Sequence, residues 1–257
     1  MHEVRAFYDE LASDYHLIYE DWWSSVERQG RALHALIESR LGPGPKRVLD
    51  CTCGIGTQTL GLSLHGHQLL GTDLSGVAIA RASEEALARG LVAEFRVWDV
   101  RDLASLEGGP FDVVLSADNS LSHLATAGEL LEAARGMRTQ TASKGAAVIT
   151  LRDYEALLQA GVSTQGPRVY GEPGFGRRVI IQLWDWEDGG PVYNLEHIIL
   201  TETSEGYRTS SHSCRCRALT RREVEESFAE AGASGVEWLE SEATGFYQPI
   251  MWVTWAD

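Results

Sequence analysis

The sequence predicts an α/β fold, a doubly wound and mostly parallel sheet that carries an inserted antiparallel β cap. Three observations predict it. Short apolar runs alternate with helical stretches up to Arg152. Two long, aromatic-rich runs of alternating polarity then break the pattern, and a helix followed by strand patterns returns from Thr220. Because strands that alternate with helices pair in parallel, we expect helices on both faces of the main sheet.

The first part of the chain supplies most of this sheet. An aromatic-rich helical stretch from Phe7 to Trp23 is followed by a second from Ser24 to Leu41, which the run 42–45 ends. Strands are expected at 47–50, 68–73, 93–97, 111–115 and 146–151, and helices at 57–64, 75–89 and 127–138, with Ser75 as an N-cap.

The rest of the chain predicts the cap and a return to the sheet. Alternating runs at 178–186 and 193–201 flank a turn signal at 187–191, and 207–216 is a third candidate strand. Helix 220–231 should begin with a capping box of Thr220 and Glu223, and strands at 236–239 and 250–255 complete the core. We therefore divide the chain into a lid and core at 1–152, a substrate cap at 153–217 and a C-terminal return at 218–257.

Charge and cysteine usage exclude some functions. A net charge of −15 argues against nucleic acid and against an anionic membrane surface as partners. No signal peptide is visible at the N-terminus, and no apolar window approaches the length of a membrane span, so we expect a cytoplasmic protein. The four cysteines form two C-x-C pairs, Cys51 with Cys53 and Cys214 with Cys216. Because zinc sites usually use C-x₂₋₄-C, we expect reduced thiols and no metal.

The strongest chemical signal is the loop from Asp50 to Thr57, with Gly54 and Gly56, at the end of the first strand. Open α/β sheets bind ligands at this edge. Dinucleotide enzymes want a third glycine where Thr59 stands, and an anion such as Asp50 is unfavourable beside a pyrophosphate. Asp50 is favourable beside the ammonium group of S-adenosylmethionine (SAM), so the loop indicates SAM.

Two further acidic residues fit an adenosine ligand. Asp73 ends the second strand and can accept hydrogen bonds from both ribose hydroxyls, in NAD or SAM alike. Asp99 follows the third strand and can accept from the adenine amino group, with Trp98 or Leu74 against the ring. The alternative for Asp99 is a simple turn or helix cap.

These motifs resemble class I SAM-dependent methyltransferases, which have a Rossmann-like fold. The segments 7–12, 15 and 19–22, 118–123 and 151–154 are similar to the N-terminus, substrate loop and Arg-Asp/Asn-Tyr segment of glycine and sarcosine N-methyltransferases. Segments 182–186 and 245–249 resemble bacterial relatives that act in betaine synthesis. The likeness covers most of the chain.

The resemblance implies in-line transfer of a methyl group from SAM to the amine of a small, carboxylate-bearing molecule such as glycine or sarcosine. It implies catalytic roles for Tyr19, Asn119 and His123, and acceptor binding by Tyr8, Asn119, Arg152 and Tyr154. Expected cofactor contacts are Tyr15, Trp22, Asp50, Gly54, Gly56, Thr57, Asp73, Leu74, Trp98, Asp99 and Ser116.

Several alternatives stay open. The enzyme could methylate O, S or C, could be an NAD-dependent oxidoreductase, or the chain could be a non-catalytic SAM-binding module. Arg152 could pair with Asp153 or Glu155, and His123 could be structural. The aromatic N-terminal segment could be core packing alone.

Overall fold

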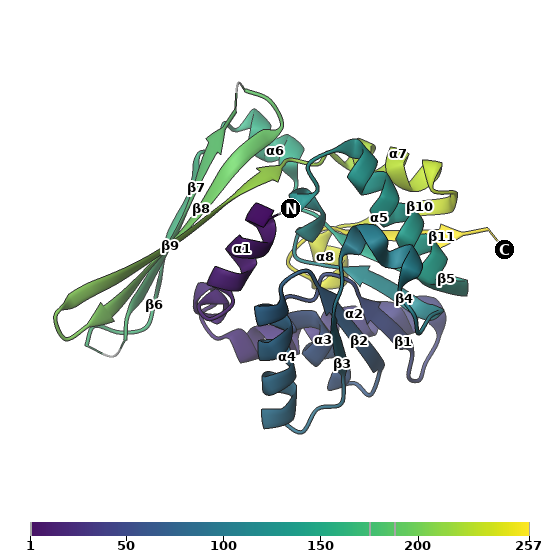
Figure 1. The fold of residues 1–257 in the computed structure, drawn as a ribbon, viewed down its shortest axis with the longest axis horizontal. Coiled ribbons are helices and arrows are strands. Elements are labelled where there is room, and N and C mark those ends of the chain that lie inside the picture. Colours follow the sequence, from purple (N-terminus) through teal and green to yellow (C-terminus); the bar gives the residue numbers. More distant parts are fainter. Residues whose placement is uncertain (1, 175, 188, 257) are drawn as a thin grey trace.

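The computed structural model describes residues 2–174, 176–187 and 189–256. The strands among them form two separate sheets (Figure 1). The main sheet has the strand order β10-β11-β5-β4-β1-β2-β3, and β1 to β5 pair in parallel. Its strands are β1 (Arg47–Asp50), β2 (Gln68–Asp73), β3 (Glu94–Val97), β4 (Phe111–Ser116), β5 (Thr141–Thr150), β10 (Ala233–Leu239) and β11 (Ile250–Trp255). β11 runs antiparallel to β5 and β10. The predicted fold class is confirmed.

Helices cover both faces of the main sheet because its central strands are apolar on both sides. Val48 packs with Leu33 of α2 (Trp22–Leu41) and Leu62 of α3 (Thr57–Ser63). Its neighbour Leu49 faces the other layer, with Leu130 of α5 (Ala127–Gln140). Each Å² of apolar surface that is removed from water contributes about 25 cal/mol to stability. Because the sheet buries apolar surface on both faces, we expect it to be the more rigid part of the molecule.

Helices α2 and α3 cross closely over the loop that follows β1. A Cβ on Gly30 would lie 2.4 Å from the carbonyl carbon of Gly61, and one on Gly61 would lie 2.6 Å from the Val26 oxygen. Neither position admits a side chain, so the backbones meet directly and hold the start of α3.

The remaining helices precede the first strand or lie between the strands along the chain. Ser75 caps α4 by accepting from the Ala78 amide, as predicted. The other helices are α1 (His2–Leu11), η1 (Tyr15–Ile18), α4 (Gly76–Ala88), η2 (Val100–Ser105), η3 (Ser120–His123), α6 (Tyr154–Gln159), α7 (Arg221–Glu230) and α8 (Ser241–Thr244).

Two local predictions were wrong. The stretch from Phe7 to Trp23, expected to be helical, is interrupted, because Tyr15 opens the 3₁₀ turn η1 and Tyr19 follows it in an extended conformation; the two tyrosines therefore do not share a helix face. The capping box at α7 is only half formed. The Thr220 hydroxyl accepts from the Glu223 amide at 3.1 Å, but the Glu223 carboxylate pairs with Arg217 instead.

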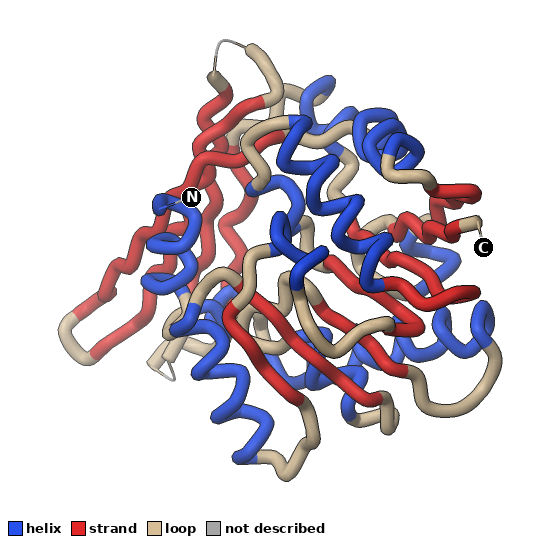
Figure 2. The backbone as a smooth tube through the Cα atoms, turned by 45° about the vertical axis from the view of Figure 1, so that its right-hand side comes forward, coloured by secondary structure: helices blue, strands red, loops and turns tan. Residues whose placement is uncertain are grey.

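The second sheet is antiparallel, with the order β6-β7-β8-β9, and projects from the body (Figures 1 and 2). Its strands are β6 (Thr164–Tyr170), β7 (Arg178–Trp186), β8 (Val192–Thr203) and β9 (Gly206–Arg217). Sequence alternation predicted three of the four strands. It missed β6, because Gly166 and Pro167 interrupt the pattern. Helix α1 lies between this sheet and the body, packed on β9 and α4.

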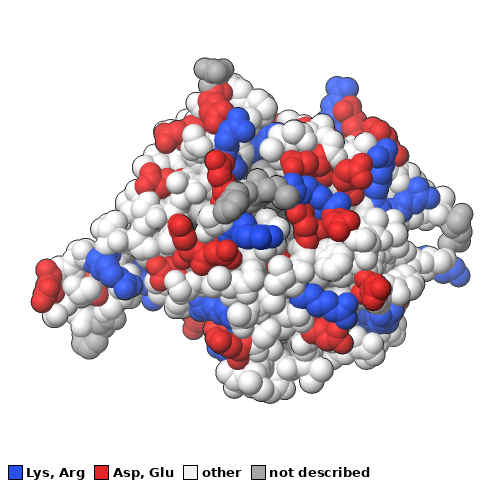
Figure 3. All heavy atoms as spheres, in the orientation of Figure 1, with Lys and Arg blue, Asp and Glu red and all other residues white. Residues whose placement is uncertain are grey.

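Surface features agree with the composition. Acidic and basic side chains are interspersed over the face shown in Figure 3, where no broad basic surface gathers. Among the described residues, no helix is long and apolar enough to cross a membrane.

Candidate active site

Two cavities meet at the carboxyl edge of the main sheet. The strand-end cavity is lined by the loop after β1 and the ends of β2 and β3. The inter-sheet cavity, of about 900 Å³, lies between that edge, α1 and the inner face of the second sheet. Five residues line both cavities: Tyr8, Tyr15, Asp118, His123 and Cys216. They mark the passage that joins the two cavities.

The loop after β1 wraps a carboxylate. Gly54 (φ 53°) and Gly56 (φ 91°) have left-handed backbone angles that side chains disfavour. The turn brings the Gly54 amide to Asp73 Oδ2 at 2.9 Å, while the Ser75 amide donates to Oδ1 at 2.9 Å. Burial raises the pKa of Asp73, and its remaining lone pairs are free to accept from a ligand in the cavity it lines.

Asp50 lies beneath the same loop, wholly buried. The Thr59 hydroxyl donates to Oδ2 at 2.8 Å, whereas Oδ1 has no hydrogen-bond partner among the described residues. Burial raises the pKa of this carboxyl to about 7. A cationic ligand group near the loop would favour its charged form. Sequence reasoning treated Thr59 only as a missing glycine and did not see that it orients Asp50.

The residues predicted for the adenine end lie together in the structure. Leu74, Trp98 and Asp99 all line the strand-end cavity. Asp99 additionally caps η2, accepting from the Arg101 amide at 3.0 Å and from its Nε at 2.9 Å. Partial burial opposes ionisation, yet Arg101 holds the pKa of Asp99 below its usual value. Asp99 is therefore a helix cap, as the alternative prediction stated, and its contact with Arg101 keeps the carboxylate charged.

Four residues expected at the cofactor do not line the strand-end cavity: Trp22, Asp50, Gly56 and Ser116. The Trp22 indole donates to Thr57 Oγ1 at 2.9 Å, and the Ser116 hydroxyl lies 3.0 Å from that of Thr52. Thr57 and Thr52 line the strand-end cavity, whereas Trp22 and Ser116 do not. The structure thus places Trp22 and Ser116 as supports for cavity residues.

A cluster of tyrosines converges on Asp118 at the end of β4. Tyr15 donates to Oδ2 at 2.8 Å and Tyr19 at 3.2 Å, and Tyr247 donates to Oδ1. Burial raises the pKa of all three hydroxyls, so they remain donors. Asp118 and the following Asn119 both have positive φ, 56° and 65°, which is rare outside glycine and concentrates at functional sites.

Asn119 is engaged inside the protein. Its carbonyl accepts from the Arg152 amide at 3.1 Å and its amide donates to the Tyr154 hydroxyl at 2.6 Å. Tyr154 is fully buried, bonds Ser122 and Tyr193 as well, and lines neither cavity. The structure therefore places Tyr154 behind the wall, where it orients Asn119, rather than in direct reach of an acceptor.

Arg152 lines the inter-sheet cavity with its guanidinium 5.0 Å from the ring centre of Trp184. The predicted alternative, a pair with Asp153 or Glu155, is wrong. Asp153 caps α6 through the Ala156 amide at 3.0 Å, and Glu155 accepts from the Arg221 amide at 3.0 Å. No carboxylate of a described residue forms an ion pair with Arg152.

His123 stands at the passage between the cavities. Its Nε2 lies 2.7 Å from the Tyr8 hydroxyl, and its Nδ1 lies 3.7 Å from Cys216 Sγ. Tyr8, predicted for acceptor binding, and His123, predicted for catalysis, thus both line the passage between the cavities. The two cysteines of β9 beside them were not expected there.

The fold and the strand-end site define the class: this is the fold of class I SAM-dependent methyltransferases. The acceptors present suit SAM, because Asp73 lines the strand-end cavity and offers carboxylate lone pairs to a ribose, while the charge of Asp50 lies buried directly beneath the loop. Residues 48–145 match the family described as a methyltransferase domain.

Known proteins share parts of the chain. It is 34% identical over 100 residues to a ubiquinone biosynthesis O-methyltransferase of Xanthomonas axonopodis pv. citri, which covers 36% of this chain and 41% of that protein. It is 27% identical over 140 residues to glycine N-methyltransferase of Oryctolagus cuniculus, covering 49% of this chain and 48% of that protein. The chain thus spans less than half the length of these two relatives.

A solved structure matches far more of the chain. SAM-bound CalS10, an amino pentose methyltransferase from Micromonospora echinaspora, superimposes with a TM-score of 0.71 at 20% identity. The match covers 89% of this chain and 91% of that one, so it extends beyond the main sheet into the inserted segment.

Proposed function

We propose that this chain is a SAM-dependent methyltransferase that methylates the amine of a small molecule carrying a carboxylate, the class to which glycine and sarcosine belong. The observation that carries the proposal is Arg152, a cation on the wall of the inter-sheet cavity that forms no ion pair with a carboxylate of a described residue, although the charge of Asp118 acts on it.

A guanidinium in this position would be stabilised by a bound anion. Removing a charge from water is costly unless a partner or hydrogen bonds replace the lost solvation. The Trp184 ring supports the cation from one side, and the planar donor fork suits a carboxylate. If Arg152 holds the carboxylate of the acceptor, the carbon chain of the acceptor extends its amine toward the passage between the two cavities.

The residues of the passage fit the demands of methyl transfer. When bound, SAM supplies the electrophilic methyl group. Tyr8 and Tyr15 line both cavities and can exclude water from the passage, and Tyr15 and Tyr19 hold Asp118 through their hydroxyls. Alignment of the acceptor and exclusion of water are the main contributions an enzyme makes to such a displacement.

The size of the inter-sheet cavity bears on the acceptor. About 900 Å³ lies at the upper end of the range typical of small-molecule sites and is far more than glycine fills. We therefore extend the proposed class to larger amino acids, with the cap at 153–217 as the acceptor-binding unit. The relatives named above methylate oxygen or nitrogen, and CalS10 acts on an amino sugar, so the anion requirement is the part to test.

The test is a transfer assay with labelled SAM, a panel of amino acids and the matched amines that lack the carboxylate. We expect turnover of amino acids only. Arg152→Lys keeps the charge but loses the fork, so KM for the acceptor should rise at least about tenfold, equivalent to about 1.4 kcal/mol, with SAM affinity unchanged. Arg168→Lys, at the same cavity, is the matched control. A best acceptor without any anionic group would refute the carboxylate proposal.

A further inference from the structure

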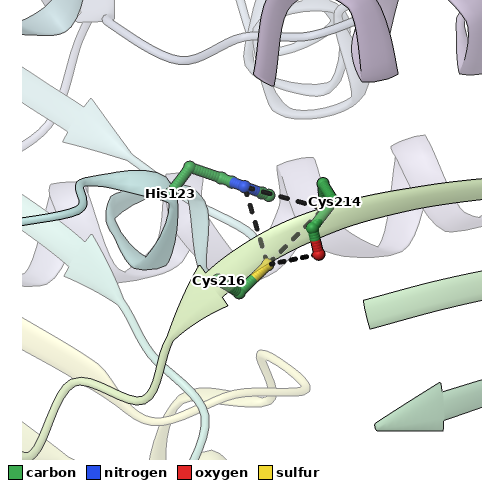
Figure 4. Close-up of side chains that lie close together, drawn as sticks. All are labelled: His123, Cys214 and Cys216. Carbon is green, nitrogen blue, oxygen red and sulfur yellow. Dashed lines mark hydrogen bonds between the residues drawn. The ribbon is translucent and has the colours of Figure 1, made fainter. Parts of the chain in front are cut away.

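The inner face of the second sheet and η3 bring three metal-binding side chains together. Cys214 and Cys216 are two apart on β9, so their side chains point to the same face of the strand. His123, at the end of η3, turns its Nδ1 toward them (Figure 4). The three donor atoms lie within 4.8 Å of one another.

We propose that Cys214, Cys216 and His123 bind a zinc ion at the passage between the two cavities. The proposal concerns the metal alone and does not depend on which acceptor the enzyme uses.

The spacing of the donors matches one face of a zinc tetrahedron. Zn–S bonds of about 2.3 Å and Zn–N bonds of about 2.1 Å at tetrahedral angles put two sulfurs about 3.8 Å apart and each sulfur about 3.6 Å from the nitrogen. The Cys214 and Cys216 sulfurs are 3.5 Å apart, and they lie 4.0 and 3.7 Å from His123 Nδ1. Each edge is therefore within about 0.4 Å of the ideal value.

The donor types favour zinc over other common ions. Two thiolates and an imidazole suit zinc, whereas magnesium and calcium require oxygen ligands. Both thiols are buried and unbridged. Two thiolates balance the charge of a divalent ion, so the loaded site would be neutral, which a buried position tolerates best.

Tyr8 supplies the outer support that zinc-bound histidines normally have. Its hydroxyl lies 2.7 Å from His123 Nε2, and the two rings meet edge to face with centres 5.2 Å apart. When Nε2 carries the proton and donates a hydrogen bond to the Tyr8 oxygen, Nδ1 has a free lone pair with which to bind the metal. Sequence reasoning did not expect this site because the histidine lies 91 residues before Cys214, far beyond any local motif.

The site has three protein ligands among the described residues, the number that zinc enzymes use when the fourth position exchanges. His123 and Cys216 line both cavities, so the fourth position is accessible from the passage. An amine nitrogen bound there would have no lone pair left to attack a methyl group. The exchangeable ligand is therefore water, or a hydroxyl, thiol or carboxylate group of the acceptor.

The experiment is reconstitution of the full chain, purified in a non-thiol reductant without metal, with one equivalent of Zn²⁺ or Co²⁺. We expect one bound zinc per chain, and with cobalt the thiolate charge-transfer absorption and visible bands of a tetrahedral site. The variant C214S/C216S should lose both. The variant C51A/C53A removes the other C-x-C pair, which forms no metal-binding group with a histidine among the described residues, and should keep them.

Circular dichroism verifies that each variant is folded, and His123→Asn gives a second, single-residue removal of a ligand. The proposal is overturned if folded wild-type protein binds no metal, or if C214S/C216S binds it as well as wild type. Added 2-mercaptoethanol should shift the cobalt spectrum. An unchanged spectrum would refute the exchangeable fourth position. None of these readouts uses methyl transfer, so their failure would leave the proposed function standing.

Discussion

The two sheets bury their side chains in different ways. Every residue of β2 after the first is buried, whereas β8 alternates along most of its length between buried and partly exposed positions. The main sheet is covered on both faces and is held by apolar packing before any ligand binds. The second sheet is covered on one face only, and that face is a cavity wall. In the proposed enzyme, one sheet therefore fixes the cofactor end, and the other shapes the acceptor end.

This division can be tested first at the cofactor end, where we expect the largest effect. Asp73→Ala should weaken SAM binding by about 2–4 kcal/mol, because buried ribose hydroxyls would lose their acceptor. Titration calorimetry measures this directly. Asp112→Asn, at the opposite edge of the sheet where Asp112 accepts from the Arg47 amide, is the control. Equal affinities in Asp73→Ala and wild type would remove Asp73 from the cofactor site.

The rigidity of the body can be tested by overpacking. Gly61→Ala places a methyl group 2.6 Å from the Val26 oxygen, and we expect a loss of about 2–3 kcal/mol in the free energy of unfolding. Gly190→Ala, in the turn of the second sheet, meets its nearest atom at 3.4 Å and should cost less than about 1 kcal/mol. Urea unfolding compares the two variants. Similar losses would contradict the difference between the sheets.

A third test uses pH. Burial lowers the pKa of His67 to about 4, and its Nδ1 accepts from the Lys46 amide at 3.0 Å. The unfolded chain takes up a proton near pH 6.5 and the folded body does not. Stability is therefore lost as pH falls from about 6.5 toward 4, and His67 contributes no further loss below that.

The matching variant is His67→Asn, which keeps an acceptor but cannot titrate. Its loss of stability over this pH range should be smaller than that of wild type by about 2 kcal/mol. Denaturant unfolding at pH 7 and pH 4.5 measures the difference. Parallel curves for the two proteins would show that His67 is not the group responsible.

The smallest effect is expected in the tyrosine cluster. Tyr19→Phe removes one of three donors to Asp118, so KM for the acceptor should rise only a few-fold, equivalent to about 1 kcal/mol. Tyr207→Phe, at an exposed position near the start of β9, should change nothing. A loss in Tyr19→Phe as large as that in Asp73→Ala would mean that Tyr19 contacts the reacting groups directly.

The sequence pattern predicted those features that depend on residues close together in the chain, such as strands and the residues at their ends. Strand 68–73 carries the apolar pair Leu69 and Leu70 between polar ends, and the position of Asp73 follows from its place at the strand end. Contacts across the fold had no such signal. Tyr247 reaches Asp118 from 129 residues away, and a hydroxyl can equally point into a cavity or, as in Tyr154, behind its wall. Sequence spacing gives a side chain's position on an element but not its partners.

The linker between α1 and α2 is held from both sides. Arg81 of α4 donates to the carbonyl oxygens of Ala12 and Ser13, and Arg178 of β7 donates to those of Tyr19 and Glu20, both at 3.0 Å. The linker therefore couples the two halves mechanically. Tyr15, which lies on it, borders both cavities, so exchange of either ligand requires the same tether to loosen. We expect departure of the spent cofactor and entry of the next acceptor to share one kinetic step.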